Sequence, residues 1–239
     1  MGESPEPTRF YVVHMMKTGG TTLTWHARAT YGLEGVYPYE QLGDGPYLVA
    51  YTSVSHIVER VTARIDDVRV VFTHAPLYVA SLLPGEWKTI TVLREPVARV
   101  CSALRAQHRG PGPCEGLGAE AIYERYDFRH TADNHQVKMM AARDSDGFDV
   151  PLTAALTVDE ERVRAAKSAL ETIDYVALHE TYDAMLARLA AEHGWRTGLA
   201  ADQNLGTPLD IPDSLLARIA SDNEGDAELV AHARSLLGI

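Results

Sequence analysis

A lysine, two glycines and three threonines stand together near the start of the chain. They follow a short apolar run, Phe10 to Val13, and precede an apolar-periodic segment, Leu23 to Tyr31. The run predicts a buried strand and the periodic segment a helix, so the polar residues form the turn between them. Such a turn aims backbone N–H groups and a helix N-terminus at an anion. The residues that we expect to hold a phosphate or sulfate are Lys17, Thr18, Gly19, Gly20, Thr21 and Thr22.

The order of these residues differs from the common nucleotide-binding loop. That loop reads G-x-x-x-x-G-K-[ST], with the lysine after the second glycine, whereas Lys17 precedes its glycine pair. The common loop also ligates magnesium, with help from an Asp at another strand end. The next two candidate strands end in Thr73-His74 and Arg94-Glu95, without an Asp. The histidines and cysteines show no zinc-ligand spacing either, so we expect an anion held without a metal.

A second set of anion-binding residues follows another strand. A β-run ends at Arg94, and a helix begins near Pro96, since proline is tolerated in the first helical turn. Arg94 would then lie at the carboxyl edge of the sheet, where open α/β sheets bind ligands. Ser102 lies two turns into that helix, with Arg99 and Arg105 near it. Arg94 and Ser102 could hold a second phosphate, and the alternative is a solvated basic helix face.

Together the two motifs resemble the paired signatures of sulfotransferases that use 3′-phosphoadenosine 5′-phosphosulfate (PAPS). The Lys17 loop resembles their 5′-phosphosulfate loop, and its His-x-x-Lys-Thr-Gly-Gly-Thr form is closest to the carbohydrate-type branch. The Arg94–Ser102 segment resembles their 3′-phosphate site. Asn134-His-Gln136 and the stretch Tyr175–Leu189, with Asn204 beyond it, are weaker similarities. The sequence departs from the family where Met15-Met16 replace a common proline and where Trp25 comes about one turn later than an adenine-stacking tryptophan.

The resemblance implies an α/β, P-loop NTPase-like three-layer fold with a central parallel sheet flanked by helices. It implies a sulfotransferase that moves a sulfuryl group from PAPS to a hydroxyl of a carbohydrate or small-molecule acceptor, without a metal. Lys17 would contact the 5′-phosphosulfate and its bridging oxygen, with donors from the rest of the loop. Arg94 and Ser102 would hold the 3′-phosphate.

A base must take the acceptor proton in such a reaction. His74 follows a predicted strand in Thr73-His74-Ala75-Pro76, which resembles the Thr-His-x-Pro element whose histidine is the family's base. The alternative is a histidine bonded only to loop backbone. His14 is a rival that we interpret as structural, and Glu95 and His56 are weaker candidates.

Two other functions stay open at this stage. One is a P-loop kinase-like phosphotransferase, which would need magnesium and a carboxylate partner. The other is a non-catalytic nucleotide-binding protein. The acceptor is not identified by the sequence, although aromatic faces or the polar segment Phe128 to His135 could border its pocket. The tyrosines concerned are Tyr37, Tyr39, Tyr47 and Tyr51.

Composition agrees with one globular enzyme domain over residues 1–239. The chain has 46% hydrophobic residues and a net charge of −11, which disfavours a nucleic-acid partner. It has no apolar run long enough to span a membrane and no secretory signal, and its two cysteines suit a reduced, cytoplasmic protein. We expect residues 1–8 to be flexible and residues 32–51 to form an irregular lobe on the acceptor side. Oligomeric state is not predicted.

Alternation of short apolar runs with periodic segments predicts a parallel sheet covered on both faces. The expected strands are Phe10–His14, Arg69–Thr73, Thr89–Leu93 and Tyr175–Leu178. The expected helices are Gly20–Tyr31, Val54–Arg64, Pro96–His108, Asn134–Arg143, Val158–Glu171 and Thr181–His193, with a helical, acidic end from Pro212 to Ile239. Thr157 to Glu160 has the form of a capping box. Arg109 to Gly116 reads as a loop.

Overall fold

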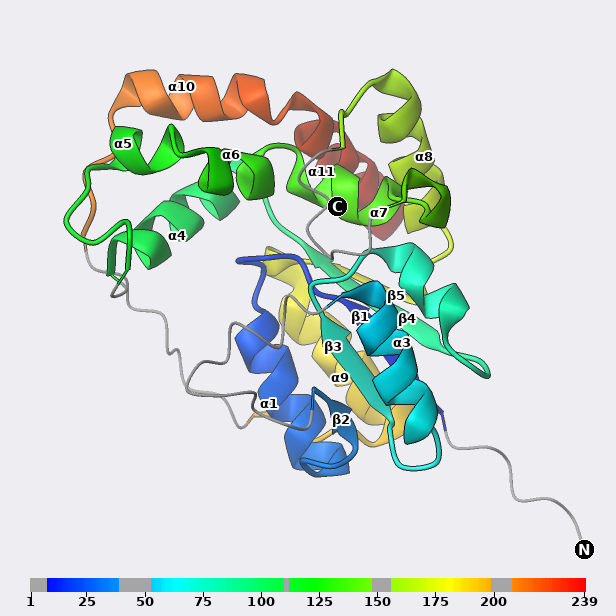
Figure 1. Ribbon diagram of the computed structural model, residues 1–239. Helices are drawn as coiled ribbons and strands as arrows, with labels where there is room; N and C mark the ends of the chain where they lie inside the picture. The colour runs from blue at the N-terminus through cyan, green and yellow to red at the C-terminus, as the bar shows by residue number, and fades with distance from the viewer. Residues whose placement is uncertain (1–7, 39–52, 110–111, 148–155, 199–207) are drawn as a thin grey trace, which may run out of the picture.

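A computed structural model describes residues 8–38, 53–109, 112–147, 156–198 and 208–239. Within these residues, five parallel strands form one sheet in the order β2-β3-β1-β4-β5 (Figure 1). They are β1 (Phe10–Val13), β2 (Val36–Tyr37), β3 (Val70–Thr73), β4 (Lys88–Leu93) and β5 (Tyr175–Leu178). The four expected strands are confirmed to within one residue at each end, and β2 is an edge strand that the sequence pattern did not predict.

Helices lie on both sides of this sheet and beyond its carboxyl end. The α-helices are α1 (Gly20–Tyr31), α3 (Val54–Ala63), α4 (Pro96–Arg109), α5 (Ala119–Tyr123), α6 (Tyr126–Ala132), α7 (His135–Ala141), α8 (Glu160–Leu170), α9 (Tyr182–His193), α10 (Asp213–Asp222) and α11 (Glu224–Leu237). Shorter 3-10 turns are η1 (Leu77–Leu82), η2 (Asp144–Asp146) and η4 (His179–Thr181). Figure 1 shows α4, α5, α6 and α10 grouped above the sheet.

The strands are mostly apolar because both faces of the sheet are covered, and the polar residues Lys88 and Thr89 lie at the start of β4. On one face, residues such as Phe10 and Val12 pack against α1 and α9. On the other face, Tyr11 and Val13 join a larger cluster with α3, α7, α8 and α11. The fold class is therefore α/β, with a central all-parallel sheet flanked by helices as expected.

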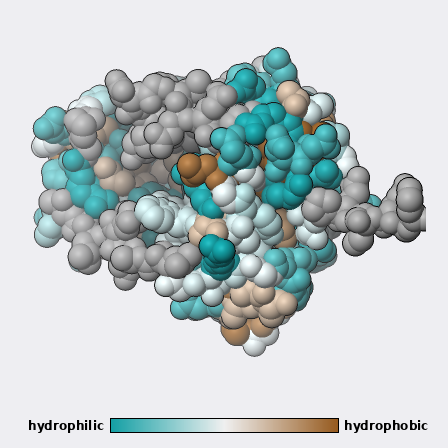
Figure 2. Space-filling view, turned by 90° about the horizontal axis from the view of Figure 1, so that it is seen from below, coloured by the Kyte–Doolittle hydropathy of each residue, from teal (hydrophilic) through white to brown (hydrophobic). Residues whose placement is uncertain are grey.

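A third apolar cluster joins α4, α5, α6 and α10 away from the sheet. Cys101 and Cys114 are buried in it as free thiols. No helix in the described ranges has the length and apolar character needed to cross a membrane. The face shown in Figure 2 is largely hydrophilic to neutral, with hydrophobic residues in small separate groups.

Several local expectations are corrected by the structure. Asp159, not Thr157, caps α8, because its carboxylate accepts a hydrogen bond of 2.9 Å from the Arg162 amide. The end of the chain forms two helices that meet at Asn223. The helices α5 and α6 were not predicted, since each is too short to show a clear apolar period.

For Arg99, the structure excludes the alternative of a solvated basic helix face. Arg99 is fully buried, and its Nη2 lies 3.5 Å from an Asp226 carboxylate oxygen that is itself fully buried. The same guanidinium nitrogen donates to the Ala132 carbonyl and to Asn223 Oδ1. Arg99 therefore ties α4 to α11 instead of binding a ligand.

The buried Arg99–Asp226 pair predicts that removing one charge lowers stability more than removing both charges. Asp226→Ala should lower the free energy of unfolding by about 3–5 kcal/mol, because it leaves the Arg99 charge buried without its counter-ion. An Arg99→Met/Asp226→Leu double variant should cost less than the single change, since it buries no charge. Urea unfolding followed by circular dichroism measures both. A double variant less stable than Asp226→Ala would contradict this account.

Candidate functional site

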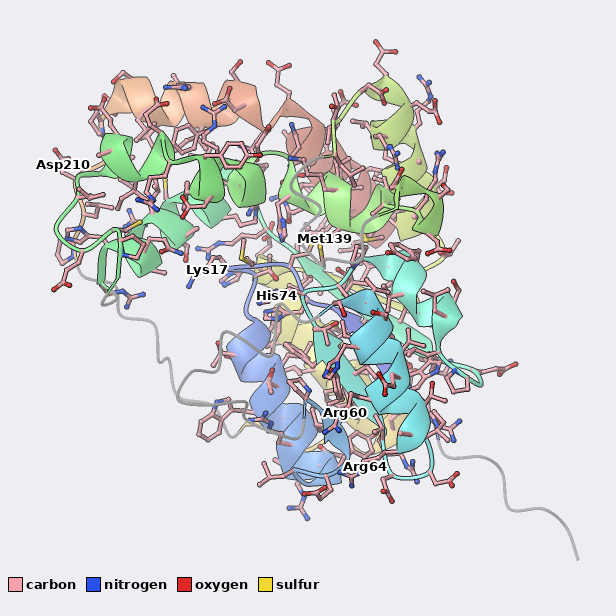
Figure 3. The ribbon with its side chains drawn as sticks, viewed as in Figure 1. Lys17, Arg60, Arg64, His74, Met139 and Asp210 are labelled. Atoms are coloured by element: carbon pink, nitrogen blue, oxygen red, sulfur yellow. The ribbon has the colours of Figure 1, made fainter. Side chains whose placement is uncertain are left out.

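The carboxyl ends of three adjacent strands place the candidate residues along one edge of the sheet. Val13 is in register with Thr73 on one side and with Thr91 on the other. The chain leaves β1 toward β2 and leaves β4 toward β5, on opposite sides, so the β1–β4 boundary is a topological switch point. Ligands in open α/β sheets bind outside such a point. Figure 3 shows Lys17 and His74 at this end of the sheet, and Arg60 of α3 and the following Arg64 toward the opposite end.

The loop between β1 and α1 is held in an unusual backbone conformation. Lys17 has φ of 68° and Gly19 has φ of 101°, so both adopt left-handed conformations. Such a conformation is costly for a lysine and persists only where surrounding contacts impose it. The buried Thr18 hydroxyl donates to the Met15 carbonyl at 3.0 Å. The Met16 amide donates to His135 Nε2 at 3.4 Å. The Thr18 hydroxyl is thus bonded within the loop, and Thr18 can contribute its backbone N–H to an anion.

In this conformation a row of backbone donors has no acceptor among the residues that the structure describes. In the described part of the chain, none of the N–H groups from Lys17 to Thr22 donates to a protein acceptor. The start of α1 also has no side-chain cap and no acidic residue in its first turn, whereas Ser53 and Asp159 cap α3 and α8. A bare helix N-terminus next to unpartnered N–H groups is suited to an anion.

Gly20 is required by a close approach to His14. A Cβ built at Gly20 would collide with the imidazole of His14, which lies directly against the helix start. Burial lowers the pKa of His14 well below its usual range, and the neighbouring His74, His135 and Lys17 lower it further. A neutral imidazole therefore packs against the start of α1, and the structural role of His14 stays a prediction.

Positive charge gathers beside these donors. Arg94 Nη1 donates to the Lys17 carbonyl at 3.1 Å and so connects the two sequence motifs. Burial lowers the pKa of Lys17, and the charges of Arg109 and Arg94 lower it further. Burial and the charge of Arg105 likewise lower the pKa of Arg94. Lys17, Arg94, Arg105 and Arg109 thus form a local group of cations, in a chain of net charge −11, that is suited to an anion.

Ser102 and Glu95 have different places on α4. Ser102 is partly exposed and lies three residues before Arg105, so the two share a helix face. Glu95 caps α4, since its carboxylate accepts from the amides of Val97 at 3.2 Å and Ala98 at 2.7 Å. This cap gives Glu95 a structural function at the start of the helix.

His74 has the protonation state that a general base needs. Its ring stacks on His14 with centroids 4.2 Å apart, and its Nδ1 lies 2.8 Å from the His14 carbonyl. Because a carbonyl only accepts, Nδ1 carries the proton and Nε2 is the basic nitrogen. Burial lowers the pKa of His74, which keeps the ring neutral at physiological pH.

The other residues singled out from the sequence lie elsewhere. Trp25 is 52% exposed on α1, and His56 is in the first turn of α3. Tyr37 and Phe128 are buried in apolar clusters. Tyr39, Tyr47, Tyr51 and Asn204, with most of the expected 32–51 lobe and residues 1–7, lie outside the described residues.

The structure adds residues whose roles the sequence did not reveal. His135 and Gln136 contact the loop and Arg94, although only a weak resemblance marked that segment. Arg109, expected in a loop, ends α4 close enough to Lys17 to lower the lysine pKa. The Tyr182 ring packs against Gly19, where an added Cβ would lie 3.7 Å from Cε2.

The comparisons assign no family. The chain matches no protein-family model and no curated protein. Among the described residues, no group of three or more histidine, cysteine or acidic side chains is arranged to hold a metal ion.

The contact between Gly20 and His14 gives a direct test of the loop. Gly20→Ala should weaken the binding of a phosphate or sulfate anion at least about tenfold, because the new methyl group displaces the donor row. Isothermal titration calorimetry measures the affinity. Gly118→Ala is the matched control, since its Cβ meets nothing within 4 Å at a φ of −68°. A His14→Ala/Gly20→Ala variant should recover part of the loss. Unchanged affinity in Gly20→Ala would refute the assignment of the donor row.

Proposed function

We propose that the chain is a PAPS-dependent sulfotransferase that transfers a sulfuryl group to a hydroxyl of a carbohydrate or small-molecule acceptor. The observation that carries the proposal is the contact between the two motifs. The unpartnered N–H row that begins at Lys17 adjoins the Arg94 guanidinium, which donates to the Lys17 carbonyl at 3.1 Å. A ligand with two separated anionic groups suits this pairing, and PAPS is such a ligand.

The finer fold assignment belongs to the same proposal. We infer a P-loop NTPase-like domain, supported by a glycine loop that joins the central strand β1 to α1 at the switch point of a parallel sheet. The two buried, free thiols are compatible with the proposed cytoplasmic location.

Each of the proposed site residues has a separate role in the reaction. The acceptor oxygen attacks sulfur in line, a new O–S bond forms, and the bond between sulfur and the bridging phosphate oxygen breaks. His74 Nε2 takes the acceptor proton. Lys17 and the loop N–H groups stabilise the negative charge that develops on the leaving phosphate. Arg94 and Ser102 hold the 3′-phosphate and so orient the donor. The proposed reaction involves no covalent enzyme intermediate.

A magnesium-dependent kinase-like reaction has less support. It needs a carboxylate at a strand end to help hold the metal. Directly after the described strands β1, β3 and β4, the chain presents His14, His74 and Arg94. Glu95, the next residue, is occupied as the cap of α4. The position of His74 also favours a catalyst over a protein that only binds nucleotides.

The direct test is transfer of labelled sulfate from PAPS. The purified protein should modify at least one compound in pooled metabolites and glycans, with a product mass gain of one sulfuryl group. Adenosine 3′,5′-bisphosphate should accumulate in equal amount. Bisphosphate binding without any transfer would instead support a non-catalytic protein, and ATP turnover that requires magnesium would support the kinase alternative.

Substitutions at Lys17 and His74 should separate charge stabilisation from proton transfer. Lys17→Ala should abolish turnover, because the leaving phosphate loses its cation. His74→Ala should lower kcat about 10²–10⁴-fold, the usual contribution of a general base, while adenosine 3′,5′-bisphosphate still binds. Thr24→Ala is a control, since its hydroxyl bonds to the Gly20 carbonyl within α1. Near-normal turnover in His74→Ala would remove His74 as the base.

The lowered pKa of Lys17 predicts proton uptake when a phosphate ligand binds at alkaline pH. The free lysine loses its proton below its usual value of 10.5, and a bound anion restores the charge. The affinity for adenosine 3′,5′-bisphosphate should therefore fall as pH rises through that lowered pKa. Calorimetry at several alkaline pH values up to the usual 10.5, in buffers of different ionisation enthalpy, measures the number of protons taken up. Lys17→Arg should abolish the uptake, whereas proton release by the wild-type protein would contradict the assignment.

A further inference from the structure

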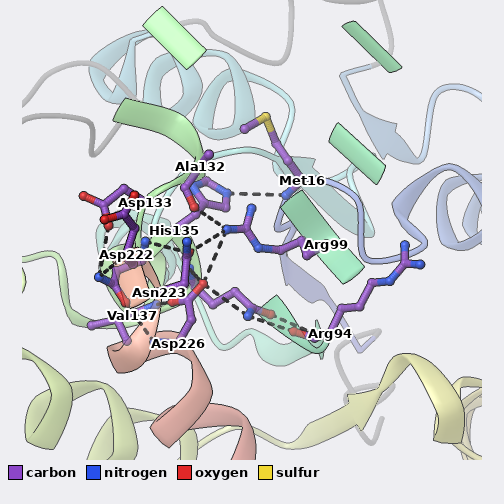
Figure 4. A network of polar contacts seen from close by, with 12 residues as sticks. Met16, Arg94, Arg99, Ala132, Asp133, His135, Val137, Asp222, Asn223 and Asp226 are labelled. Atoms are coloured by element: carbon purple, nitrogen blue, oxygen red, sulfur yellow. Dashed lines mark hydrogen bonds and ion pairs between the residues drawn. The ribbon is translucent and has the colours of Figure 1, made fainter. Parts of the chain in front are cut away.

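Two consecutive residues at the start of α7 reach both halves of the proposed site. His135 Nε2 accepts from the Met16 amide at 3.4 Å, one residue before Lys17 (Figure 4). Gln136 contacts the backbone of Arg94. One turn of one helix therefore contacts the loop after β1 and the strand end of β4.

The contact between Gln136 and Arg94 is reciprocal. The Arg94 amide donates to Gln136 Oε1 at 2.9 Å, and Gln136 Nε2 donates to the Arg94 carbonyl at 2.9 Å. The Gln136 side chain is fully buried, so water does not compete for these bonds and loss of one partner is costly. The pair fixes the backbone from which the Arg94 guanidinium extends toward Lys17.

The start of α7 is in turn anchored to α11. Asp226 accepts from the Gln136 amide at 3.2 Å, the Val137 amide at 2.8 Å and Gln136 Nε2 at 3.2 Å. Asn134 Oδ1 accepts from the Asp226 amide at 2.9 Å. Because Arg99 of α4 pairs with the same carboxylate, α4, α7 and α11 share one buried network. The position of Gln136 is thus set by packing that is independent of any ligand.

We propose that Gln136 and His135 are positioning residues that set the separation between the loop donors and the Arg94 guanidinium. Both are buried, so they act through the backbone of Arg94 and of Met16 and not by touching a ligand. Gln136 thereby determines the preference of the site for a nucleotide with a 3′-phosphate as well as a 5′-phosphate. This inference rests on the proposed function, because it assigns the 3′-phosphate to Arg94.

The test compares two nucleotides that differ only in the 3′-phosphate. In the wild-type protein, calorimetry should show tighter binding of adenosine 3′,5′-bisphosphate than of adenosine 5′-monophosphate. Gln136→Met keeps the side-chain volume and removes both bonds to Arg94. It should weaken bisphosphate binding about tenfold or more, the effect of losing a charge-assisted hydrogen bond, and leave monophosphate binding nearly unchanged. In Gln136→Met, the ratio of the Kd values for the two nucleotides should therefore approach the ratio measured in Arg94→Ala.

Matched variants separate positioning from stability. Val137→Ala changes a buried residue of the same helix whose side chain packs only in the core, so it should lower Tm and keep the ratio. His135→Leu removes the acceptor of the Met16 amide. It should weaken the binding of the bisphosphate and of the monophosphate by similar factors. Adding Gln136→Met to Arg94→Ala should cause little further loss of bisphosphate affinity, because both substitutions act on the contact between Arg94 and the 3′-phosphate.

The outcomes distinguish this inference from the proposed function. A wild-type protein without preference for the bisphosphate overturns the assignment of the 3′-phosphate itself. A wild-type preference that survives in Gln136→Met overturns the positioning role alone. If Gln136→Met does not fold, Gln136→Glu keeps the acceptor for the Arg94 amide and loses the donor to the Arg94 carbonyl and to Asp226. An unchanged ratio in that folded variant likewise overturns the positioning role.

Discussion

The hydrogen bond from the Arg94 guanidinium to the Lys17 carbonyl is the contact on which the proposed site depends. It joins the loop after β1 to the end of β4, two segments that lie 77 residues apart in the chain. The carbonyl that accepts from Arg94 belongs to Lys17, the residue with the left-handed conformation. The donor row and the second cation therefore form as one arrangement.

This arrangement costs stability in the absence of a ligand. Unpartnered N–H groups, a strained lysine backbone and mutually repelling cations each oppose folding. The surrounding structure offsets the cost through the apolar clusters on both faces of the sheet and the buried Arg99–Asp226 network. An anion would satisfy the donors and restore the charge of Lys17, so binding should stabilise the protein. Natural proteins commonly retain such strained sites because function requires them.

Local patterns predicted the elements that begin the site, but not the contacts that complete it. The strands β1, β3 and β4 and the helix α1 follow from short apolar runs and a glycine turn, which are local signals. The buried place of Arg99 was not predicted, because its partner Asp226 lies 127 residues away in the chain. Likewise, nothing near Gln136 in the sequence indicates that its amide pairs with the Arg94 backbone. The two-residue strand β2 was missed because so short a segment has no measurable alternation.

The measurement that tests the central claim most directly is nucleotide binding with magnesium removed. Calorimetry in excess EDTA should show that adenosine 3′,5′-bisphosphate binds, and that added magnesium leaves its affinity unchanged. ATP should bind much more weakly under both conditions, because it lacks a 3′-phosphate for Arg94. Binding of ATP that requires magnesium, together with no binding of the bisphosphate, would contradict a two-phosphate site of the sulfotransferase kind.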